Sequence, residues 1–264
     1  MSGFSADWLA LREPHDRRAR NVEVLDAVVT AFASHISLNV ADIGCGTGST
    51  YRVLSPRLPS TQRWRLYDND LSLLARAAGP ANVTTLPLDL SRDLEAALDG
   101  AVDLVTTSAL LDLVSVRWLE RFATEVAARR LSVYAALSYD GRAKLDPVDE
   151  TDAKIIAAVN AHQRTDKGFG PALGPAAAQA AVEQFERLDY AVMQGVSDWV
   201  FQPGDREIQT EILSGWASAA RETGDVPLDQ VMGWLTRRRE LVSSGRSTIR
   251  VGHVDFFARP IGMR

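Results

Sequence analysis

The sequence predicts an α/β fold, a doubly wound and mostly parallel sheet of seven strands with helices on both faces. Short apolar runs rich in β-branched residues alternate with helical patterns through the first half of the chain. A glycine-rich turn at residues 44–48 separates the first such run from the first helix that follows it. Because parallel strands need crossover connections, we expect ligands to bind at the carboxyl ends of the strands.

The boundaries of each element follow from apolar periodicity and from residues that end it. Strands are predicted at residues 37–43, 63–67, 83–88, 102–107, 131–137, 190–201 and 248–258. Helices are predicted at residues 47–58, 71–78, 93–98, 116–130, 146–160, 176–188, 207–222 and 228–241. Pro59 ends the first of these helices, and Gly79 with Pro80 closes the second.

The length of 264 residues suits one large domain. We expect an N-terminal helical segment at 1–36 and a ligand-binding core at 37–142. Helical insertions are expected after the fifth and sixth strands, at 143–175 and 202–246, where they would cover the substrate. Neither periodicity nor composition chooses between a monomer and a homodimer.

The composition argues against several classes of function. Lys and Arg number 29 against 34 Asp and Glu, a net charge of −5, which is a poor match for nucleic acid. The basic clusters 17–20 and 237–239 are short and are interpreted as solvated helix faces. A single cysteine and no His or Cys cluster at zinc spacing predict a reducing, cytoplasmic setting and no metal. The start has no secretion signal, and no apolar run reaches about 18 residues, so no membrane span is expected.

The glycine-rich turn has the sequence Ala-Asp-Ile-Gly-Cys-Gly-Thr-Gly at positions 41–48. Glycines at alternate positions allow positive φ and a close approach of backbone to ligand. With its acid two residues before the first glycine, this segment resembles the first motif of the class I S-adenosylmethionine-dependent methyltransferases, and that fold is expected with it. The resemblance implies that Asp42 steers the turn and the amino group of the methionine moiety, with Gly44, Cys45, Gly46 and Gly48 along the cofactor.

The resemblance extends to the ends of the next strands. It implies that Asp68, with Asn69, holds the ribose hydroxyls, and that Asp89 and Leu90 hold the adenine. It further implies that the segment after the fourth strand passes under the methionine part, where Ser108 and Leu111 are expected to touch the cofactor. Outside these motifs, Arg20 or Arg18 of the N-terminal segment is a candidate to reach the cofactor carboxylate, with a surface helix as the alternative. Asp68 and Asp89 taken singly have a second interpretation, as N-caps of the helices that follow.

Methyl transfer from a sulfonium requires a positioned nucleophile and exclusion of water, with a general base only for some acceptors. Three residues after the fifth strand or in the following insertion are candidates for that base: His162, Tyr139 and Asp140. Arg164 and Lys167 together would bind a carboxylate or phosphate of the acceptor. Trp199, at the end of the sixth strand, either adds an aromatic wall or is a core residue, and His253 is expected only to alternate within the last strand.

These features predict a methyltransferase that moves a methyl group to an O, N or C nucleophile of a small molecule and releases S-adenosylhomocysteine. A binding module without catalysis stays open, because an intact cofactor pocket does not guarantee chemistry. An RNA-modifying enzyme is disfavoured by the acidic composition and by Thr-Ser-Ala-Leu at 107–110, where the Asn or Asp-Pro-Pro-aromatic signature would stand. A nicotinamide oxidoreductase would need glycine at position 49, where Ser stands.

Overall fold

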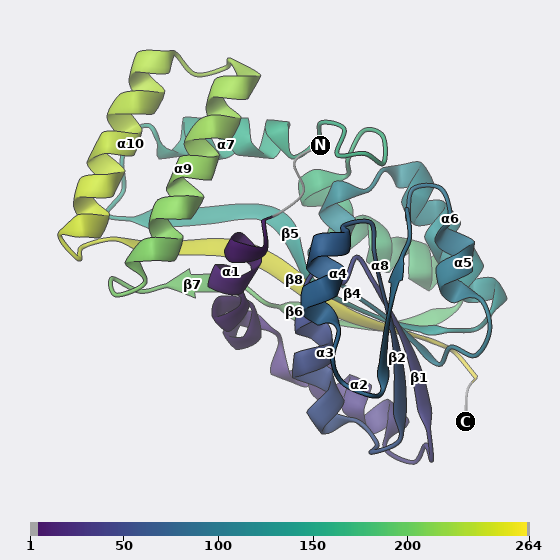
Figure 1. Cartoon of the computed structure of the whole chain (residues 1–264). Helices are drawn as coiled ribbons and strands as arrows, with labels where there is room; N and C mark the ends of the chain where they lie inside the picture. The colour runs from purple at the N-terminus through teal and green to yellow at the C-terminus, as the bar shows by residue number, and fades with distance from the viewer. Residues whose placement is uncertain (1–4, 263–264) are drawn as a thin grey trace.

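The structure, a computed structural model, describes residues 5–262 and contains one eight-stranded sheet (Figure 1). The strands are β1 Leu38–Ile43, β2 Gln62–Asp68, β3 Val83–Pro87, β4 Leu104–Ser108, β5 Ser132–Asp146, β6 Tyr190–Val196, β7 Trp199–Phe201 and β8 Thr248–Pro260. The α-helices are α1 Ala6–Ala19, α2 Val22–Phe32, α3 Ser49–Leu54, α4 Leu71–Ala77, α5 Leu94–Leu98, α6 Val116–Ala128, α7 Asp152–His162, α8 Ala177–Arg187, α9 Arg206–Thr223 and α10 Leu228–Ser243. Short 3-10 turns lie at Ser55–Arg57, Leu111–Leu113 and Gly174–Ala176.

The sheet order is β3-β2-β1-β4-β5-β8-β6, with β7 paired to β8. The five strands from β3 to β5 run parallel to their neighbours, whereas β8 is antiparallel to both β5 and β6. The predicted fold class is therefore confirmed, with seven strands along the main path and β7 beside it. The single antiparallel strand, β8, places the C-terminal segment between β5 and the edge strand β6.

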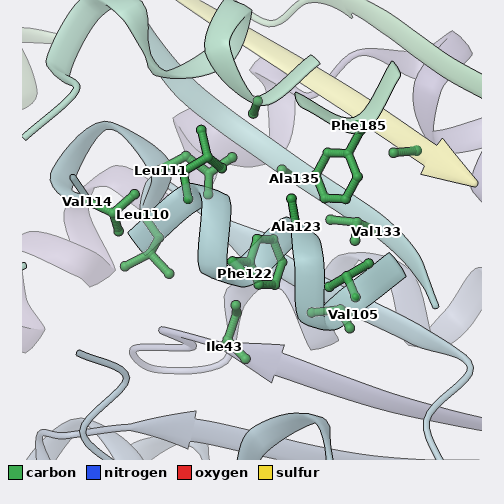
Figure 2. Close-up of a cluster of buried hydrophobic side chains, with 14 of the residues drawn as sticks. Ile43, Val105, Leu110, Leu111, Val114, Phe122, Ala123, Val133, Ala135 and Phe185 are labelled. Carbon is green, nitrogen blue, oxygen red and sulfur yellow. The ribbon is translucent and has the colours of Figure 1, made fainter. Parts of the chain in front are cut away.

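Helices cover both faces of the parallel part. Alternate residues of β1 divide between two cores, with Leu38 and Val40 on one face and Ala41 and Ile43 on the other. The first core packs against α2, α3 and α4, and the second against α5, α6 and α8. Figure 2 shows the second core, in which residues of α6, β4 and β5 surround Phe122. Burial of these apolar faces holds the strand ends of the site in register.

A third hydrophobic cluster lies along the C-terminal half of β5 and the N-terminal half of β8. It joins β7 to α7, α9 and α10, which stand together beside the parallel sheet (Figure 1). In this cluster the guanidinium of Arg238 is fully buried, hydrogen-bonded to Asp152 and the carbonyl of Pro147. The interpretation of 237–239 as a solvated face is therefore wrong for Arg238, because only its two neighbours in the cluster point to solvent.

Three predicted boundaries are wrong where the chain pairs with the distant strand β8 or follows that pairing, and one is the helix predicted at 146–160, which begins only at Asp152. β5 continues to Asp146 rather than ending at 137, and the predicted strand 190–201 is two strands separated at Ser197 and Asp198. The β5–β8 ladder shifts register between Ala135 and Ser138 and again between Tyr139 and Ala143. The polar Asp-Gly pair at 140–141 is typical of a turn that ends a strand. In the structure β5 continues through it, because it pairs with β8, and the pair lies at a register shift of the ladder.

Candidate functional site

The glycine-rich turn lies between the end of β1 and the start of α3. Gly44, Gly46 and Gly48 all have positive φ, of 65°, 54° and 83°. A Cβ atom at Gly44 would lie 3.3 Å from the side chain of Leu110, and one at Gly46 would lie 3.1 Å from Leu9. The missing side chains therefore leave a narrow cradle at the carboxyl edge of the sheet.

Cys45 takes a structural place in this turn. Its backbone N–H donates to the carbonyl of Tyr67 at 3.0 Å, which ties the turn to β2. Its side chain is buried, and burial together with Asp42 and Asp68 raises the pKa of the thiol. A thiol in these surroundings is not activated as a nucleophile.

Asp42 is a buried carboxylate with one oxygen left unpartnered. Its Oδ1 accepts a hydrogen bond from Thr106 Oγ1 at 2.7 Å, and its Oδ2 has no partner within residues 5–262. Burial raises the pKa of Asp42 to about 7, while the hydrogen bond from Thr106 and the charge of Arg20 oppose the rise. An orphaned buried oxygen is costly unless a ligand satisfies it.

Arg20, which follows α1, is 3% exposed and points to the same strand ends. Its Nη2 donates to Thr50 Oγ1 at 3.1 Å and to Ser108 Oγ at 3.3 Å, and its Nη1 donates to the hydroxyl of Tyr134 at 3.2 Å. Its Nε has no partner among the described residues. The cluster 17–20 is therefore not uniformly solvated, because Arg20 leaves the helix face and enters the site.

Behind Arg20 lies a buried acid that sequence reasoning missed. The hydroxyl of Tyr134 donates to Asp255 Oδ2 at 3.2 Å, and the backbone N–H groups of Asn21 and Leu137 donate to the same carboxylate. Burial raises the pKa of Asp255, against the opposing charge of Arg20. The sequence did carry a signal for Asp255, which stands between Val254 and Phe256 in an apolar strand. An acid in such a strand is buried only if it has a partner, so its position indicated a buried polar contact.

Asp68 and Asp89 do not cap the helices that follow them, so the N-cap interpretation is wrong. Asp68 Oδ2 accepts from the backbone N–H of Gly46 at 2.8 Å, and its Oδ1 accepts from Asp70 at 3.0 Å. Asp70 is the residue that caps α4. Asp89 Oδ1 accepts from the backbone N–H of Ser91 at 3.0 Å in a turn before α5.

Both Asp68 and Asp89 are half-buried at neighbouring strand ends, as the doubly wound topology requires. Asn69, next to Asp68, is exposed. Leu90 is 5% exposed, and its carbonyl accepts from the indole N–H of Trp118 at 2.7 Å. Its side chain is therefore part of the core, and its backbone is held in place.

After β4 the structure differs from the prediction for Leu111. Its side chain is 1% exposed and belongs to the core around Phe122, as Figure 2 shows. The neighbouring Leu110 instead packs on Gly44. The one-residue difference follows from the positive φ of 52° at Ala109, which turns the chain before the 3-10 helix and which the sequence does not reveal.

The three candidate bases lie in different surroundings. The hydroxyl of Tyr139 is buried and donates to Asn160 Oδ1 at 2.7 Å, and burial raises the pKa of this phenol, which disfavours it as a base. The carboxylate of Asp140 is committed to Arg142, whose Nε lies 2.7 Å away. His162 Nε2 lies 2.9 Å from Glu222 at the end of α9.

The predicted acceptor-binding residues separate into two groups. Lys167 Nζ lies 3.4 Å from His162 Nδ1 and 3.0 Å from Thr165 Oγ1, and burial lowers the pKa of Lys167. Arg164 is exposed and donates to the carbonyl of Asn160 at 3.1 Å. Trp199 lies elsewhere, packed beside α1 and His253.

Sequence reasoning missed three further buried residues, Arg12, Asp16 and Asp112, and gave His253 no role beyond its place in the last strand. The indole of Trp199 donates to Asp16 Oδ1 at 2.9 Å and lies 4.6 Å from the ring of His253. Asp112 is 6% exposed, and burial raises its pKa to about 6. The signals were weak, since an isolated Arg, His or Asp in an amphipathic segment is normally a surface residue.

Two other properties concern the described residues as a whole. Within residues 5–262 no helix is long and apolar enough to cross a membrane. In the same part of the chain no group of three or more His, Cys, Asp or Glu side chains is arranged to hold a metal ion.

Comparison with solved structures places this arrangement among known folds. A cyclopropane-fatty-acyl-phospholipid synthase-like protein from Lactobacillus casei is similar with a TM-score of 0.55 and 14% identity, over 97% of this chain and 95% of that one. A cyclopropane synthase from Mycobacterium tuberculosis is similar with a TM-score of 0.52 and 12% identity, over 97% of this chain and 94% of the other.

A third structure, described as a putative type II methyltransferase from Anaeromyxobacter dehalogenans, has a TM-score of 0.51 and 14% identity, over 90% of this chain and 96% of its own. No model of a protein family and no curated protein matches the sequence. At these identities the likeness concerns the fold. The chain has the Rossmann-like α/β fold that these solved structures share.

Proposed function

We propose that this chain binds S-adenosylmethionine at the glycine turn and transfers its methyl group to a small-molecule acceptor. The observation that carries the proposal is the pair of buried, incompletely partnered charges beside the turn. Asp42 has an orphaned Oδ2 and Arg20 an orphaned Nε. The methionine moiety of the cofactor carries an ammonium and a carboxylate, which are the complementary charges.

The adenosine half fits the next two strand ends. Each oxygen of Asp68 accepts one N–H and keeps a further lone pair for a ribose hydroxyl. Asp89 and the fixed backbone of Leu90 lie at the end of β3, where the adenine amino group and ring would be held. Leu110, lying on Gly44, takes the contact that was expected of Leu111.

When bound, the cofactor supplies an electrophilic methyl group on a sulfonium. The chain's own contribution is to bind, orient and exclude water. Leu9 and Leu110 close the turn from two sides. His162, at the end of α7, and Lys167, after it, form a polar group. An acceptor that enters beneath the cap made by 143–175 and 202–246 would meet this group.

Calorimetric titration with S-adenosylmethionine, S-adenosylhomocysteine and NADH tests the cofactor assignment. We expect micromolar binding of the first two, and a loss of at least tenfold in affinity for Asp68→Ala, because hydrogen bonds to a charged group contribute about 1.5–3 kcal/mol. Asp70→Ala is the matched control, since it removes only the helix cap and costs about 1 kcal/mol of stability without changing affinity.

Binding of NADH in place of the two sulfur compounds overturns the proposal. Binding of the cofactor without release of S-adenosylhomocysteine, when the protein is incubated with a broad mixture of small metabolites, favours the non-catalytic alternative. Methylation of RNA in the same assay favours the RNA-modifying one.

A further inference from the structure

Arg12 and Asp112 are buried, oppositely charged and not paired with each other. Arg12 is 7% exposed and Asp112 is 6% exposed. Arg12 donates from Nε to Asp16 Oδ2 at 2.8 Å, and among residues 5–262 its two terminal nitrogens have no hydrogen-bond partner. Asp112 Oδ1 is buried without a partner in the same part of the chain. Burial raises the pKa of Asp112, and the charge of Arg12 opposes that rise.

This arrangement is unfavourable unless a ligand completes it. The charge of Arg12 is paired with Asp16, so the unmet requirement is the buried Oδ1 of Asp112, because a buried polar oxygen without a partner is costly. No nitrogen of Arg12 lies within 4.0 Å of Asp112. The two terminal nitrogens of Arg12 and the Oδ1 of Asp112 are therefore both without a hydrogen-bond partner among residues 5–262 and are not paired with each other.

The neighbours of Arg12 fix its position and leave it as the positive charge of the group. Its guanidinium carbon lies 5.3 Å from the ring centre of Trp199, whose indole N–H is held by Asp16. His253 packs against Trp199 at 4.6 Å, and burial lowers the pKa of His253 to about 3, so its imidazole is neutral near pH 7. The second face of His253 meets Tyr139, with ring centres 6.0 Å apart.

The same helix connects this group to the glycine turn. Leu9, which contacts Gly46, and Arg12 are three residues apart in α1 and so lie on one helix face. Asp112 comes two residues after Leu110, which packs on Gly44. The backbone amide of Tyr139 lowers the pKa of Asp112. Arg12 and Asp112 are therefore each within three residues of a side chain that packs on the glycine turn.

We propose that Arg12 and Asp112 bind the methyl acceptor, a small carboxylic acid that also carries a hydroxyl or amino group. The inference rests on the proposed methyltransferase function. The two free nitrogens of Arg12 match a carboxylate as a fork, and the carboxylate of Asp112 accepts from the O–H or N–H of the nucleophile. Trp199, His253 and Tyr139 provide a continuous row of ring contacts that starts beside Arg12.

The transfer step is balanced with these groups alone. The acceptor oxygen or nitrogen forms a bond to the methyl carbon, and the bond from that carbon to sulfur breaks with its electron pair on sulfur. The proton of the acceptor passes to the carboxylate of Asp112, which then releases it to solvent. Asp112 is in this scheme a catalytic residue, and Arg12 binds the acceptor.

The test uses the full-length protein saturated with S-adenosylhomocysteine and ligand-observed NMR. The probes are hydroxy and amino acids, aliphatic and aromatic, each paired with its methyl ester. We expect acids to bind and esters not to bind. Arg12→Gln should weaken the acids at least tenfold and leave affinity for S-adenosylhomocysteine unchanged. Arg12→Lys should recover part of the binding, and Arg17→Gln, an exposed position on the same helix, should change nothing.

The acids that bind are then assayed for turnover with S-adenosylmethionine. Asp112→Asn should lower kcat by about 100-fold or more while KM for the acid stays within a few fold, whereas Arg12→Gln should raise KM. Equal binding of acids and esters, insensitivity to Arg12→Gln, or full turnover by Asp112→Asn would each overturn the inference. Failure of the wild-type protein to bind S-adenosylhomocysteine would instead count against the proposed function.

Discussion

Leu9 and Gly46 are in direct contact, since a Cβ atom on Gly46 would lie 3.1 Å from Cδ1 of Leu9. The N-terminal helix therefore covers the glycine turn, although the two are separated by a whole strand and a second helix in the chain. Glu13, one turn further along α1, accepts two hydrogen bonds of 2.6 Å from Arg52 of α3. The helix is thus tied to both sides of the turn.

Gly46→Ala should weaken both the fold and the site. A non-glycine residue at φ of 54° costs about 1–2 kcal/mol, and its Cβ would also displace Leu9. We expect a lower free energy of urea unfolding and weaker binding of S-adenosylhomocysteine in calorimetry. Gly215→Ala is the control, because no atom lies near its Cβ in α9, and helix propensity should add about 0.5–1 kcal/mol. Unchanged affinity in Gly46→Ala would mean that the ligand does not approach the turn.

Asp42→Asn should stabilise the ligand-free protein. Folding raises the pKa of Asp42 from 3.8 to about 7, so the folded state binds the proton more tightly and stability falls as pH rises from about 4 to about 7. A shift of this size corresponds to roughly 4 kcal/mol above pH 7. An unpaired amide N–H in the variant costs about 1–3 kcal/mol, which leaves a net gain of about 2 kcal/mol.

The measurement is thermal unfolding of Asp42→Asn and wild type at pH 8 and near pH 4. The gain should be largest at pH 8 and shrink toward pH 4, and the same variant should lose affinity for S-adenosylmethionine. Asp26→Asn, at an exposed position of α2, should show neither effect. A variant less stable than wild type at pH 8 would contradict the assignment of Asp42 as a buried, unsatisfied charge.

Arg20→Lys should weaken binding of the methionine half of the cofactor and leave binding of the adenosine half unchanged. Lysine lacks the fork that reaches Thr50, Ser108 and Tyr134, so binding of the methionine carboxylate should weaken by about tenfold or more. Affinity for 5′-methylthioadenosine, which has no amino-acid part, should stay within about twofold in calorimetry. Its retained binding also shows that the variant is folded. Equal losses for both ligands would indicate that Arg20 only supports the structure.

Asp152→Ala should strongly destabilise the cluster formed by α7, α9 and α10. Asp152 accepts from Arg238 and from the indole N–H of Trp234 at 2.8 Å, and the guanidinium of Arg238 is fully buried. An uncompensated buried charge costs about 3–5 kcal/mol. Urea unfolding followed by tryptophan fluorescence measures this loss.

The double variant Asp152→Leu with Arg238→Met should be more stable than Asp152→Ala, because it removes both charges and fills the space. Asp26→Ala, which breaks an exposed ion pair with Arg57, should cost less than about 1 kcal/mol. Similar losses for the exposed and buried pairs would contradict the burial of Arg238.

Local patterns in the sequence predicted the parallel sheet and the strand ends that carry Asp42, Asp68 and Asp89. Apolar β-branched runs with helical crossovers leave few alternatives to this topology. The same patterns did not predict the length of β5, because its second half pairs with β8 more than a hundred residues later. They also did not distinguish Leu110 from Leu111, since one left-handed residue between β4 and the 3-10 turn decides which side chain faces Gly44.

The sequence by itself determined the fold class and the glycine turn, because both depend on neighbours within a few residues along the chain. Only the tertiary structure decided which charged residues are buried. Arg20 meets Tyr134, 114 positions away, while Arg17 in the same basic cluster remains exposed. Arg12 in α1 and Asp112 after β4 are both buried, and no local pattern records that. Burial is set by the packing of distant elements, so a charge that completes a site and one that faces solvent look alike in the sequence.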